Sequence, residues 1–403
     1  MRILFANDGF ADAGGVHSYL VSVMTGLRSR QHDLAYLHGG TRANGGLCPA
    51  LETVPCFGTA DTDLEKALTD VRAWGPQVIF SHNMGFLEVE GRLLDEWPVV
   101  KLLHGYFGTC IGGQKMFALP ACRPCSRRFG AACLALYLPR RCGEFSPAKM
   151  LSQYLWARRQ KALFGRYAAV VVASEHMKRE YVRNGLDAAT VHVNPLFPAD
   201  LPADPGPGVD AGLSLRRQSK AGERVLFLGR MTKLKGGDFV IRAVAQASAR
   251  LGRTIHLVMA GDGPQRSAWE KLAVRKKVSA EFAGWVAGPK RQRLLSSASL
   301  LAVPSIWPEP FGLAGLEAAS FGLPAIAFDV GGIGQWLTDG CNGWLVPGNP
   351  PTVRALADGL VRALGRPDQL LAMRAEARQT ARRLSLAAHL DRLETILGVA
   401  CRL

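Results

Sequence analysis

The 403-residue sequence has no run of about 18 consecutive apolar residues, so it offers no helix that would span a bilayer. Its first residues, MRILFANDG, become polar too early for a secretory signal peptide and are typical of a first β-strand. Nine cysteines without an export signal indicate a reducing, cytoplasmic setting, with thiols free or metal-bound. The length and a hydrophobic content of 48% indicate a globular chain of two domains.

Acidic residues are scarce, since 33 Asp and Glu oppose 49 Lys and Arg and leave a net charge of +16. The imbalance is greatest between Lys115 and Arg183, where 14 basic residues meet three acidic ones. Such a block favours an anionic partner, either a phosphorylated substrate, acidic lipid headgroups or nucleic acid, although a basic surface without a specific partner is the alternative. Nucleic acid is not expected, because no helix-turn-helix or RNA-binding module is present and the aromatic residues are not interleaved with the basic run.

Short apolar runs alternate with helical stretches along the whole chain, which predicts two doubly wound parallel sheets of the α/β class facing a cleft. After the first run, RILFAND, apolar residues recur at helical spacing: Val16, Tyr19, Leu20, Val23 and Leu27. The later strand-like runs are DLAYLH, PQVIFSH, VVKLLHG, AAVVVAS, RVLFLGR, IHLVMAGDG, AEFAGWV, SLLAVPS, PAIAFDVGG and GWLVPGN.

A Pro-, Gly- and Asp-rich segment, PLFPADLPADPGPGVDAGLSL, separates the two series of strands and helices. We therefore expect an N-terminal domain over residues 1–200, a linker over 201–221 and a C-terminal domain over 222–384. Ligands of such sheets lie beyond the carboxyl ends of the strands, so the polar residues that follow each strand are the functional candidates.

The segment FLGRMTKLKGGDF places Arg230 directly after a strand and Lys235 just before a helix that we expect to begin near Gly237. Two cations beside a helix N-terminus, with glycines that allow close backbone approach, are typical of a diphosphate site. A basic surface loop without a ligand is the alternative interpretation of this motif.

Two features of the N-terminal half follow the same logic. Gly14 and Gly15 open the first helix, where backbone N–H groups can face a phosphate or a sugar. His104 ends another strand, although a lone histidine is more often structural than catalytic.

The segment WPEPFGLAGLEA holds two carboxylates, Glu309 in a loop and Glu317 inside a helix expected to start around Gly312. Carboxylates that hydrolyse a glycosidic bond face each other across a sugar, about 5–10 Å apart. Two carboxylates separated by a helix start are better placed to grip two parts of one extended ligand, because each accepts hydrogen bonds from adjacent hydroxyls. With a diphosphate beside Arg230 and Lys235, such a ligand is a nucleotide-sugar.

Together these motifs resemble the family 4 retaining glycosyltransferases of group 1 type, including bacterial members with a cysteine-rich insertion in the N-terminal domain. The resemblance covers essentially the whole chain and is strongest from Val225 to Pro347. It implies the GT-B fold, with an N-terminal Rossmann-like domain for the acceptor and a C-terminal one for the donor. It also implies that residues 385–403 form a helix that packs back on the N-terminal domain. The shared motifs are Gly229-Arg230, Lys235-Gly236, Glu309 with Glu317, Gly331-Gly332 and NGWLVPG.

The resemblance implies a retaining, metal-independent transfer of a sugar from a UDP- or GDP-sugar to a hydroxyl, through an oxocarbenium-like state. Arg230 and Lys235 would stabilise the departing diphosphate, Glu309 would hold donor-sugar hydroxyls, Glu317 would hold the ribose, and His104 would lie near the donor sugar. The remaining implied donor-binding residues are Gly14, Gly15, Gly229, Phe311, Gly312 and Leu313.

Two other functions fit a GT-B chain. A nucleotide-sugar epimerase would share the donor site, but it needs further acid and base groups around the sugar, and the sequence shows no clear set. A catalytically silent nucleotide-sugar-binding protein is the second alternative, although all four charged donor-site positions are present.

A cysteine-rich insertion over about residues 108–145 departs from a minimal family member. Four of its five cysteines would suffice for a tetrahedral structural zinc, and unligated thiols or a disulfide are the alternatives. The insertion also mixes apolar residues with arginines, which suits docking to an acidic membrane surface on the inner face of the plasma membrane. A lipid-linked or cell-envelope saccharide acceptor would explain that mixture. The cysteines are Cys110, Cys122, Cys125, Cys133 and Cys142.

Overall fold

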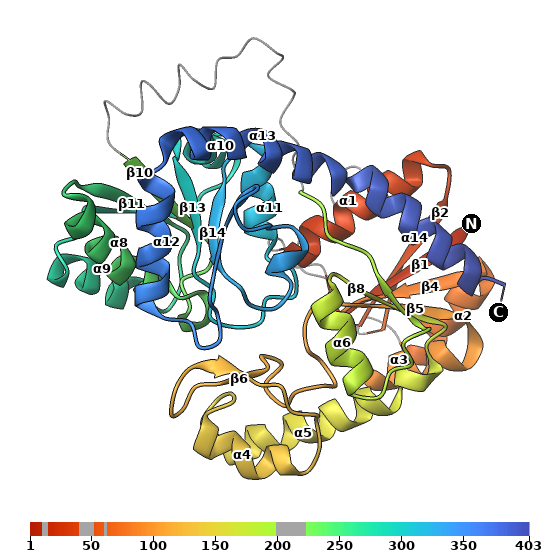
Figure 1. The fold of residues 1–403 in the computed structure, drawn as a ribbon. Coiled ribbons are helices and arrows are strands. Elements are labelled where there is room, and N and C mark those ends of the chain that lie inside the picture. The colour runs from red at the N-terminus through yellow and green to blue at the C-terminus, as the bar shows by residue number, and fades with distance from the viewer. Residues whose placement is uncertain (10–14, 40–51, 60–62, 199–222, 403) are drawn as a thin grey trace. The chain divides into compact units, whose positions relative to one another are not determined.

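The computed structural model describes residues 1–9, 15–39, 52–59, 63–198 and 223–402. The chain divides into two units, each built around its own sheet (Figure 1). The predicted linker and Gly14 lie outside the described residues. The N-terminal unit comprises Met1–Lys115, Ser126–Ala199 and Leu386–Leu403, and the C-terminal unit comprises Met116–Cys125 and Asp200–Ser385.

The N-terminal unit contains a sheet of seven parallel strands in the order β3-β2-β1-β4-β5-β8-β9. Its strands are β1 (Arg2–Asn7), β2 (Asp33–His38), β3 (Cys56–Gly58), β4 (Val78–Ser81), β5 (Val99–Leu103), β8 (Ala169–Val172) and β9 (Val191–Val193). Its principal helices outside the insertion are α1 (Gly15–Ser29), α2 (Leu64–Trp74), α3 (Leu87–Glu96), α6 (Glu175–Arg183) and α14 (Leu386–Ala400). The sequence did not predict the edge strands β3 and β9, which are only three residues long.

The core of the N-terminal unit joins the sheet to its first and last helices. Phe5 and Phe80 from the central strands pack in one cluster with Leu20 of α1 and Leu393 of α14. α14 lies beside α1 (Figure 1). The last segment of the chain is therefore part of the N-terminal unit, because its apolar face completes that unit's core.

The cysteine-rich insertion contains the helix α4 (Ala132–Arg140) and is followed by the helix α5 (Pro147–Ala162), and both helices belong to the N-terminal unit. Its short antiparallel pair, β6 (Met116–Phe117) and β7 (Arg123–Pro124), groups with the C-terminal unit. The helices α4 and α5 enclose a small core of their own. That core consists of Ile111, Phe129, Tyr137 and Ala157, with Cys133, Cys142 and neighbouring apolar residues packed against it.

The C-terminal unit contains a sheet of six parallel strands in the order β12-β11-β10-β13-β14-β15. Its strands are β10 (Glu223–Leu228), β11 (Ile255–Ala260), β12 (Ala280–Gly284), β13 (Leu300–Val303), β14 (Ala325–Phe328) and β15 (Gly343–Val346). Its helices are α8 (Gly237–Leu251), α9 (Arg266–Arg275), α10 (Gly288–Ser297), α11 (Leu313–Ser320), α12 (Val353–Leu364) and α13 (Pro367–Arg383), with short 3-10 turns η3 (Lys233–Lys235) and η4 (Ile333–Gln335). Two doubly wound parallel sheets confirm the predicted fold class.

Each sheet has one point at which the order of its strands reverses. In the N-terminal unit this point lies between β1 and β4, and in the C-terminal unit it lies between β10 and β13. Loops after these strands leave the sheet on opposite sides and open a crevice at its carboxyl edge. Both crevices carry the polar side chains described below. Within the described residues, no helix is long and apolar enough to cross a membrane.

Candidate active site

The carboxyl end of β10 carries Arg230, whose side chain is exposed. The preceding Gly229 lies close to Gly261 at the end of β11, because a Cβ on Gly261 would fall 2.0 Å from the Gly229 carbonyl oxygen. Gly261 also has a φ of +131°, which favours glycine. The two glycines therefore place backbone without side chains next to the exposed guanidinium of Arg230, so an anionic ligand has room to approach both.

Lys235 at the end of η3 pairs with Glu309 in the loop after β13. Its Nζ lies 2.6 Å from Glu309 Oε1, and the Ser305 hydroxyl donates to the same oxygen at 2.5 Å. Glu309 is only 4% exposed, and Lys235 Nζ also lies 5.7 Å from the centre of the Trp307 ring. The structure thus brings together two of the predicted catalytic residues as a partly buried ion pair.

The Gly331-Gly332 motif holds the backbone of Glu309. Gly331 has a φ of +63°, and a Cβ there would lie 2.2 Å from the Glu309 carbonyl oxygen. The Gly332 N–H donates to that same oxygen at 2.7 Å. Glycine at 331 is therefore a steric requirement for placing the Glu309 loop.

Glu317 is the fifth residue of α11, and its carboxylate pairs with Arg291 of α10. The preceding Phe311 is buried, and its carbonyl accepts a hydrogen bond from Trp336 Nε1 at 2.7 Å. Because a carboxylate has about four acceptor sites, Glu317 has the capacity to hold Arg291 and ligand hydroxyls together. The sequence did not predict that Arg291 would pair with Glu317.

Two helix N-termini belong to the loops at this switch point. Both helices start at a glycine in the left-handed region, α8 after Gly236 with a φ of +66° and α11 after Gly312 with a φ of +88°. Neither N-cap accepts a first-turn N–H through a side chain, so the helix dipoles favour an anion there. The first turn of α11, which begins with Leu313, has no acidic residue, whereas that of α8 contains Asp238. α11 is therefore the more favourable of the two for a phosphate.

His104 and Gly15 belong to the N-terminal unit. Gly15 is the exposed first residue of α1, and His104 directly follows β5. The Nε2 of His104 lies 3.1 Å from Nδ1 of His82, which follows β4. Burial, and then the nearby Lys101 ammonium, lowers the pKa of His104 to about 4. Burial also lowers the pKa of His82 well below its ordinary value, so both rings are neutral near pH 7.

The contacts of His82 fix the tautomers of this histidine pair. Its Nε2 is buried and has no hydrogen-bond partner. A buried N–H without an acceptor is rarer than a buried acceptor without a donor, so we assign the proton of His82 to Nδ1. That N–H donates to Nε2 of His104, which leaves His104 with a proton on Nδ1. His104 can therefore act as a neutral hydrogen-bond donor.

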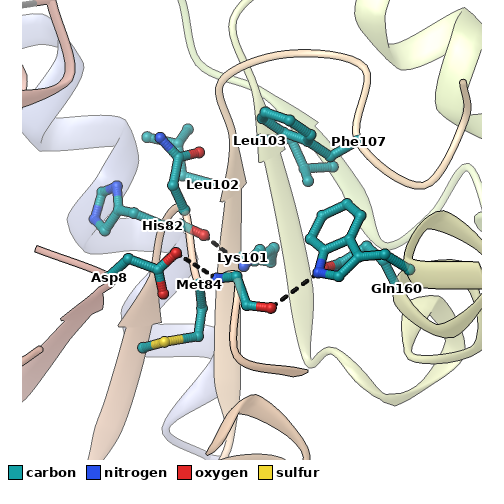
Figure 2. Close-up of a pocket in the computed structure, with 11 residues that line it drawn as sticks. Asp8, His82, Met84, Lys101, Leu102, Leu103, Phe107 and Gln160 are labelled. Atoms are coloured by element: carbon teal, nitrogen blue, oxygen red, sulfur yellow. Dashed lines mark hydrogen bonds between the residues drawn. The ribbon is translucent and has the colours of Figure 1, made fainter. Parts of the chain in front are cut away.

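A pocket opens at the switch point of the N-terminal sheet (Figure 2). Its cavity measures about 130 Å³, below the roughly 300–1,000 Å³ of sites that enclose a drug-sized ligand, so it admits part of a ligand. Gly85 links two of the lining residues, because its N–H donates to Asp8, which follows β1, and its carbonyl oxygen accepts a hydrogen bond from Trp156 of α5. The sequence did not predict this pocket, because its walls are far apart along the chain.

The five cysteines of the insertion divide between the units, with Cys122 and Cys125 in the C-terminal unit and the other three in the N-terminal unit. Across the described part of the chain, no group of three His, Cys, Asp or Glu side chains is placed to hold a metal ion. The predicted structural zinc therefore remains a prediction.

Comparison with known proteins concerns chiefly the C-terminal unit. Residues 222–366 match the family model described as glycosyl transferases group 1. An uncharacterized glycosyltransferase of Methanocaldococcus jannaschii is 37% identical over 134 residues, which is 32% of this chain and 33% of that protein. The alpha-D-kanosaminyltransferase of Streptomyces kanamyceticus is 33% identical over 148 residues, or 36% of this chain and 37% of that protein. The matches thus span only about a third of the length of these relatives.

Solved structures extend the likeness to both units. HepE of Anabaena, crystallised with UDP-glucose, has a TM-score of 0.69 and 20% identity, with 99% of each chain covered. Sucrose-phosphate synthase of Thermosynechococcus elongatus has a TM-score of 0.67 and 19% identity, with 98% of each chain covered. The chain therefore has the GT-B fold, and its residues 222–366 are similar to the group 1 glycosyltransferases.

Proposed function

We propose that this protein is a retaining glycosyltransferase of family 4 type that moves a sugar from a nucleotide-diphosphate sugar to an acceptor hydroxyl. The observation that carries the proposal is the β10/β13 switch point, where Arg230, Lys235 and the N-terminus of α11 supply positive charge and Glu309 and Glu317 supply hydroxyl acceptors. HepE of Anabaena was crystallised with UDP-glucose, which favours a UDP-sugar as the donor.

In this mechanism the diphosphate leaves against the guanidinium of Arg230 and the ammonium of Lys235. The Lys235 ammonium is paired with Glu309 in the structure. Donor binding would draw it toward the phosphates, so that Glu309 and the leaving group would share its charge. Two cations and a helix dipole would stabilise charge as it develops on the leaving oxygen, so we propose that no metal ion is required. Glu317 would hold the ribose, and Glu309 would orient the donor sugar.

The donor site is tested by incubating the protein with UDP-, GDP- and ADP-sugars in EDTA and measuring thermal shift and nucleotide release. One donor should stabilise the wild type. Arg230→Ala should lower turnover about 100-fold, since about 3 kcal/mol of leaving-group stabilisation is lost. The matched control is Arg275→Ala, which removes an exposed arginine of α9 in the same unit and should change nothing.

Three results would redirect the proposal. If no nucleotide-sugar binds, the protein is not a transferase of this type. If a donor binds without transfer or hydrolysis, the chain is a silent nucleotide-sugar-binding protein. If the sugar is released with its configuration changed at a ring carbon, it is an epimerase. NMR of the product anomer tests retention.

We further propose a cytoplasmic protein that docks peripherally on an acidic membrane and uses a lipid-linked or cell-envelope saccharide acceptor. The observation that supports this is an exposed apolar surface at the end of the insertion and on the following helix α5, formed by Phe145, Leu151 and Leu155, which are 73%, 51% and 38% exposed. Exposed Arg158 and Arg159 follow on α5. Apolar side chains flanked by cations bind anionic bilayers by insertion and by electrostatic attraction together.

Membrane docking is tested by sedimentation with vesicles of phosphatidylglycerol and phosphatidylcholine. The double variant Leu151→Ser with Leu155→Ser should lose binding, and Arg158→Gln with Arg159→Gln should lose it on acidic vesicles. Leu371→Ser, which alters a leucine of similar exposure on α13, should bind like the wild type. Equal sedimentation of all variants would contradict docking through α5.

A further inference from the structure

The pocket of the N-terminal unit has a carboxylate that no protein group satisfies fully. Asp8 Oδ2 accepts the Gly85 N–H at 2.7 Å, while Asp8 Oδ1 is buried and has no hydrogen-bond partner. A Cβ on Gly85 would lie 2.6 Å from Oδ2, and one on Gly39 would lie 3.2 Å from Oδ1. The two glycines therefore make room for this carboxylate at the edge of the cavity. Burial raises its pKa, which is the cost of keeping it out of water.

Among the described residues that line the pocket, one has an ammonium group, and its hydrogen-bond donors are all engaged within the protein. Lys101 and Glu90 are both almost fully buried, and Lys101 Nζ lies 2.6 Å from Glu90 Oε1. The same ammonium donates to Ser81 Oγ at 3.1 Å and to the carbonyl oxygen of His82 (Figure 2). An ammonium has three protons, so these three acceptors use all of them.

The other titratable groups near the pocket add no positive charge. His82 is held neutral by burial and its partner His104 is neutral at physiological pH, as their lowered pKa values show. Among the described lining residues, the charged side chains are thus Asp8 and the committed Lys101. A phosphate placed here would meet a carboxylate and no uncommitted cation, which is unfavourable in a buried site.

The opposite wall of the pocket is aromatic and rigid. Trp156 Nε1 donates to the carbonyl oxygen of Gly85 at 2.9 Å, which fixes the indole beside the loop that also holds Asp8. Phe107 packs edge-on against Trp156 with the ring centres 5.9 Å apart, and it is 40% exposed. An aromatic wall contacts the apolar C–H face of a sugar ring, while a carboxylate opposite accepts its hydroxyls.

We propose that this pocket is the acceptor subsite for an uncharged saccharide ring, bound by Asp8 through a hydroxyl and by Trp156 and Phe107 through its C–H face, and that it excludes a phosphorylated sugar. This inference rests on the proposed glycosyltransferase function and names the class of its acceptor. Asp8 Oδ1 is an acceptor without a donor and already bears the cost of desolvation. A hydrogen bond from a sugar hydroxyl to this oxygen would therefore be favourable.

The test uses the methyl glycosides of glucose, galactose and mannose and the 6-phosphates of the same sugars. Binding is measured by saturation-transfer NMR and by tryptophan fluorescence. At least one methyl glycoside should bind, and its phosphorylated counterpart should bind at least 10-fold more weakly. The glycoside that binds should also accept sugar from the donor, since the subsite positions its hydroxyl.

Variants separate the role of Asp8 from folding. Asp8→Asn keeps the shape and an oxygen for the Gly85 N–H but removes the charge, and it should weaken glycoside binding about 10- to 100-fold, the range for a hydrogen bond to a charged group. Phe107→Ala removes part of an exposed wall without touching the core and should also weaken binding. Asp95→Asn, an exposed carboxylate paired with Arg166 in the same unit, should bind like the wild type.

Several outcomes would overturn the inference. These are binding of the phosphorylated sugars as tightly as the glycosides, unchanged binding in both Asp8→Asn and Phe107→Ala, or no binding by any glycoside. The donor assay on the same preparations distinguishes the two proposals. If the nucleotide-sugar binds in an Arg230-dependent way while no glycoside binds, only the acceptor inference fails. If glycosides bind at Asp8 but no nucleotide-sugar binds, the proposed transferase function fails instead.

Discussion

Acid should loosen the N-terminal unit through His389, which secures the last helix. Nδ1 of His389 donates to the carbonyl oxygen of Pro195 at 2.8 Å, and its Nε2 accepts the hydroxyl of Tyr19 at 2.8 Å. The ring is 2% exposed and its edges pack against Phe197 and Tyr19. A proton on Nε2 would remove the acceptor of Tyr19 and place a charge in this core, so burial lowers the pKa of His389 to about 4.

The sign and size of the effect follow from that pKa. Because the folded pKa lies below the ordinary value of 6.5, the unfolded chain binds the proton more tightly. The stability is therefore complete above pH 6.5 and is lost as the pH falls from 6.5 toward 4. With these two values, the free energy of unfolding falls by about 2 kcal/mol at pH 5, and the limit below pH 4 is about 3 kcal/mol.

The assay is hydrogen exchange, read by mass spectrometry on peptides from β1 and α14, because it reports the unfolding of one unit of a two-unit chain. Wild type and His389→Gln are compared from pH 8 to pH 5 after correction for intrinsic exchange. The wild type should be the more stable at pH 8, since glutamine fits the cavity less well. Its advantage should shrink by about 2 kcal/mol by pH 5, because only the wild type takes up a proton there.

His256→Gln is the control, since His256 is an exposed histidine on β11 in the other unit. It should leave the pH dependence of β1 exchange unchanged. Parallel stability curves for wild type and His389→Gln across this pH range would show that the ring is not buried neutral. The reasoning about the last helix would then be wrong.

Three further predictions concern the C-terminal unit and the cysteines. Gly331→Ala should destabilise the C-terminal unit by about 1–3 kcal/mol in urea unfolding and weaken donor binding, because residue 331 has a φ of +63° and its Cβ would meet the Glu309 carbonyl. The control Gly340→Ala should cost less stability, because residue 340 has a φ of +76° but open space around it. Lys235→Gln and Glu309→Gln should each slow transfer. The double variant should lose less transfer rate than the two single losses combined, since a double-mutant cycle reports the coupling of the 2.6 Å ion pair. Additive losses would mean that the two residues act independently. Purified protein should contain about one zinc per chain that a chelator removes with loss of stability; metal-free protein of unchanged stability would dispose of the cysteine site.

The sequence predicted the local structure around those residues of the proposed donor site that lie within one strand, loop and helix. Arg230 and Lys235 come just after a strand, and the helix expected near Gly237 begins at that residue. The helix expected from Gly312 begins at Leu313, with Gly312 as its N-cap. These positions were predictable because strand, glycine turn and helix are local signals, and parallel strands put their carboxyl ends at one edge.

The contacts missed from the sequence join segments that only the fold brings together. Arg291 reaches Glu317 from the preceding helix, 26 residues away. Asp8 and Trp156 both hydrogen-bond to Gly85, from 77 and 71 residues away. Hydrophobic periodicity gives which face of a helix is buried, but it does not say which residue of another element lies against it. Trp156 lies on α5, after the cysteine-rich insertion, and belongs to none of the motifs that the sequence analysis used.

The two switch points differ in charge, and this difference supports the different ligands that we propose for them. The crevice of the C-terminal unit has an exposed arginine, a lysine shared with one carboxylate and an uncapped helix N-terminus, so it attracts an anion. The crevice of the N-terminal unit has a lysine with all its protons committed, two neutral histidines and the carboxylate of Asp8, so it attracts hydroxyl groups. The proposed transferase function would require this division, because a donor diphosphate that bound at the proposed acceptor subsite would block its own reaction. Replacing Asp8 with lysine should therefore let nucleotide diphosphate inhibit transfer by competing with the acceptor, whereas UDP competes only with the donor in the wild type.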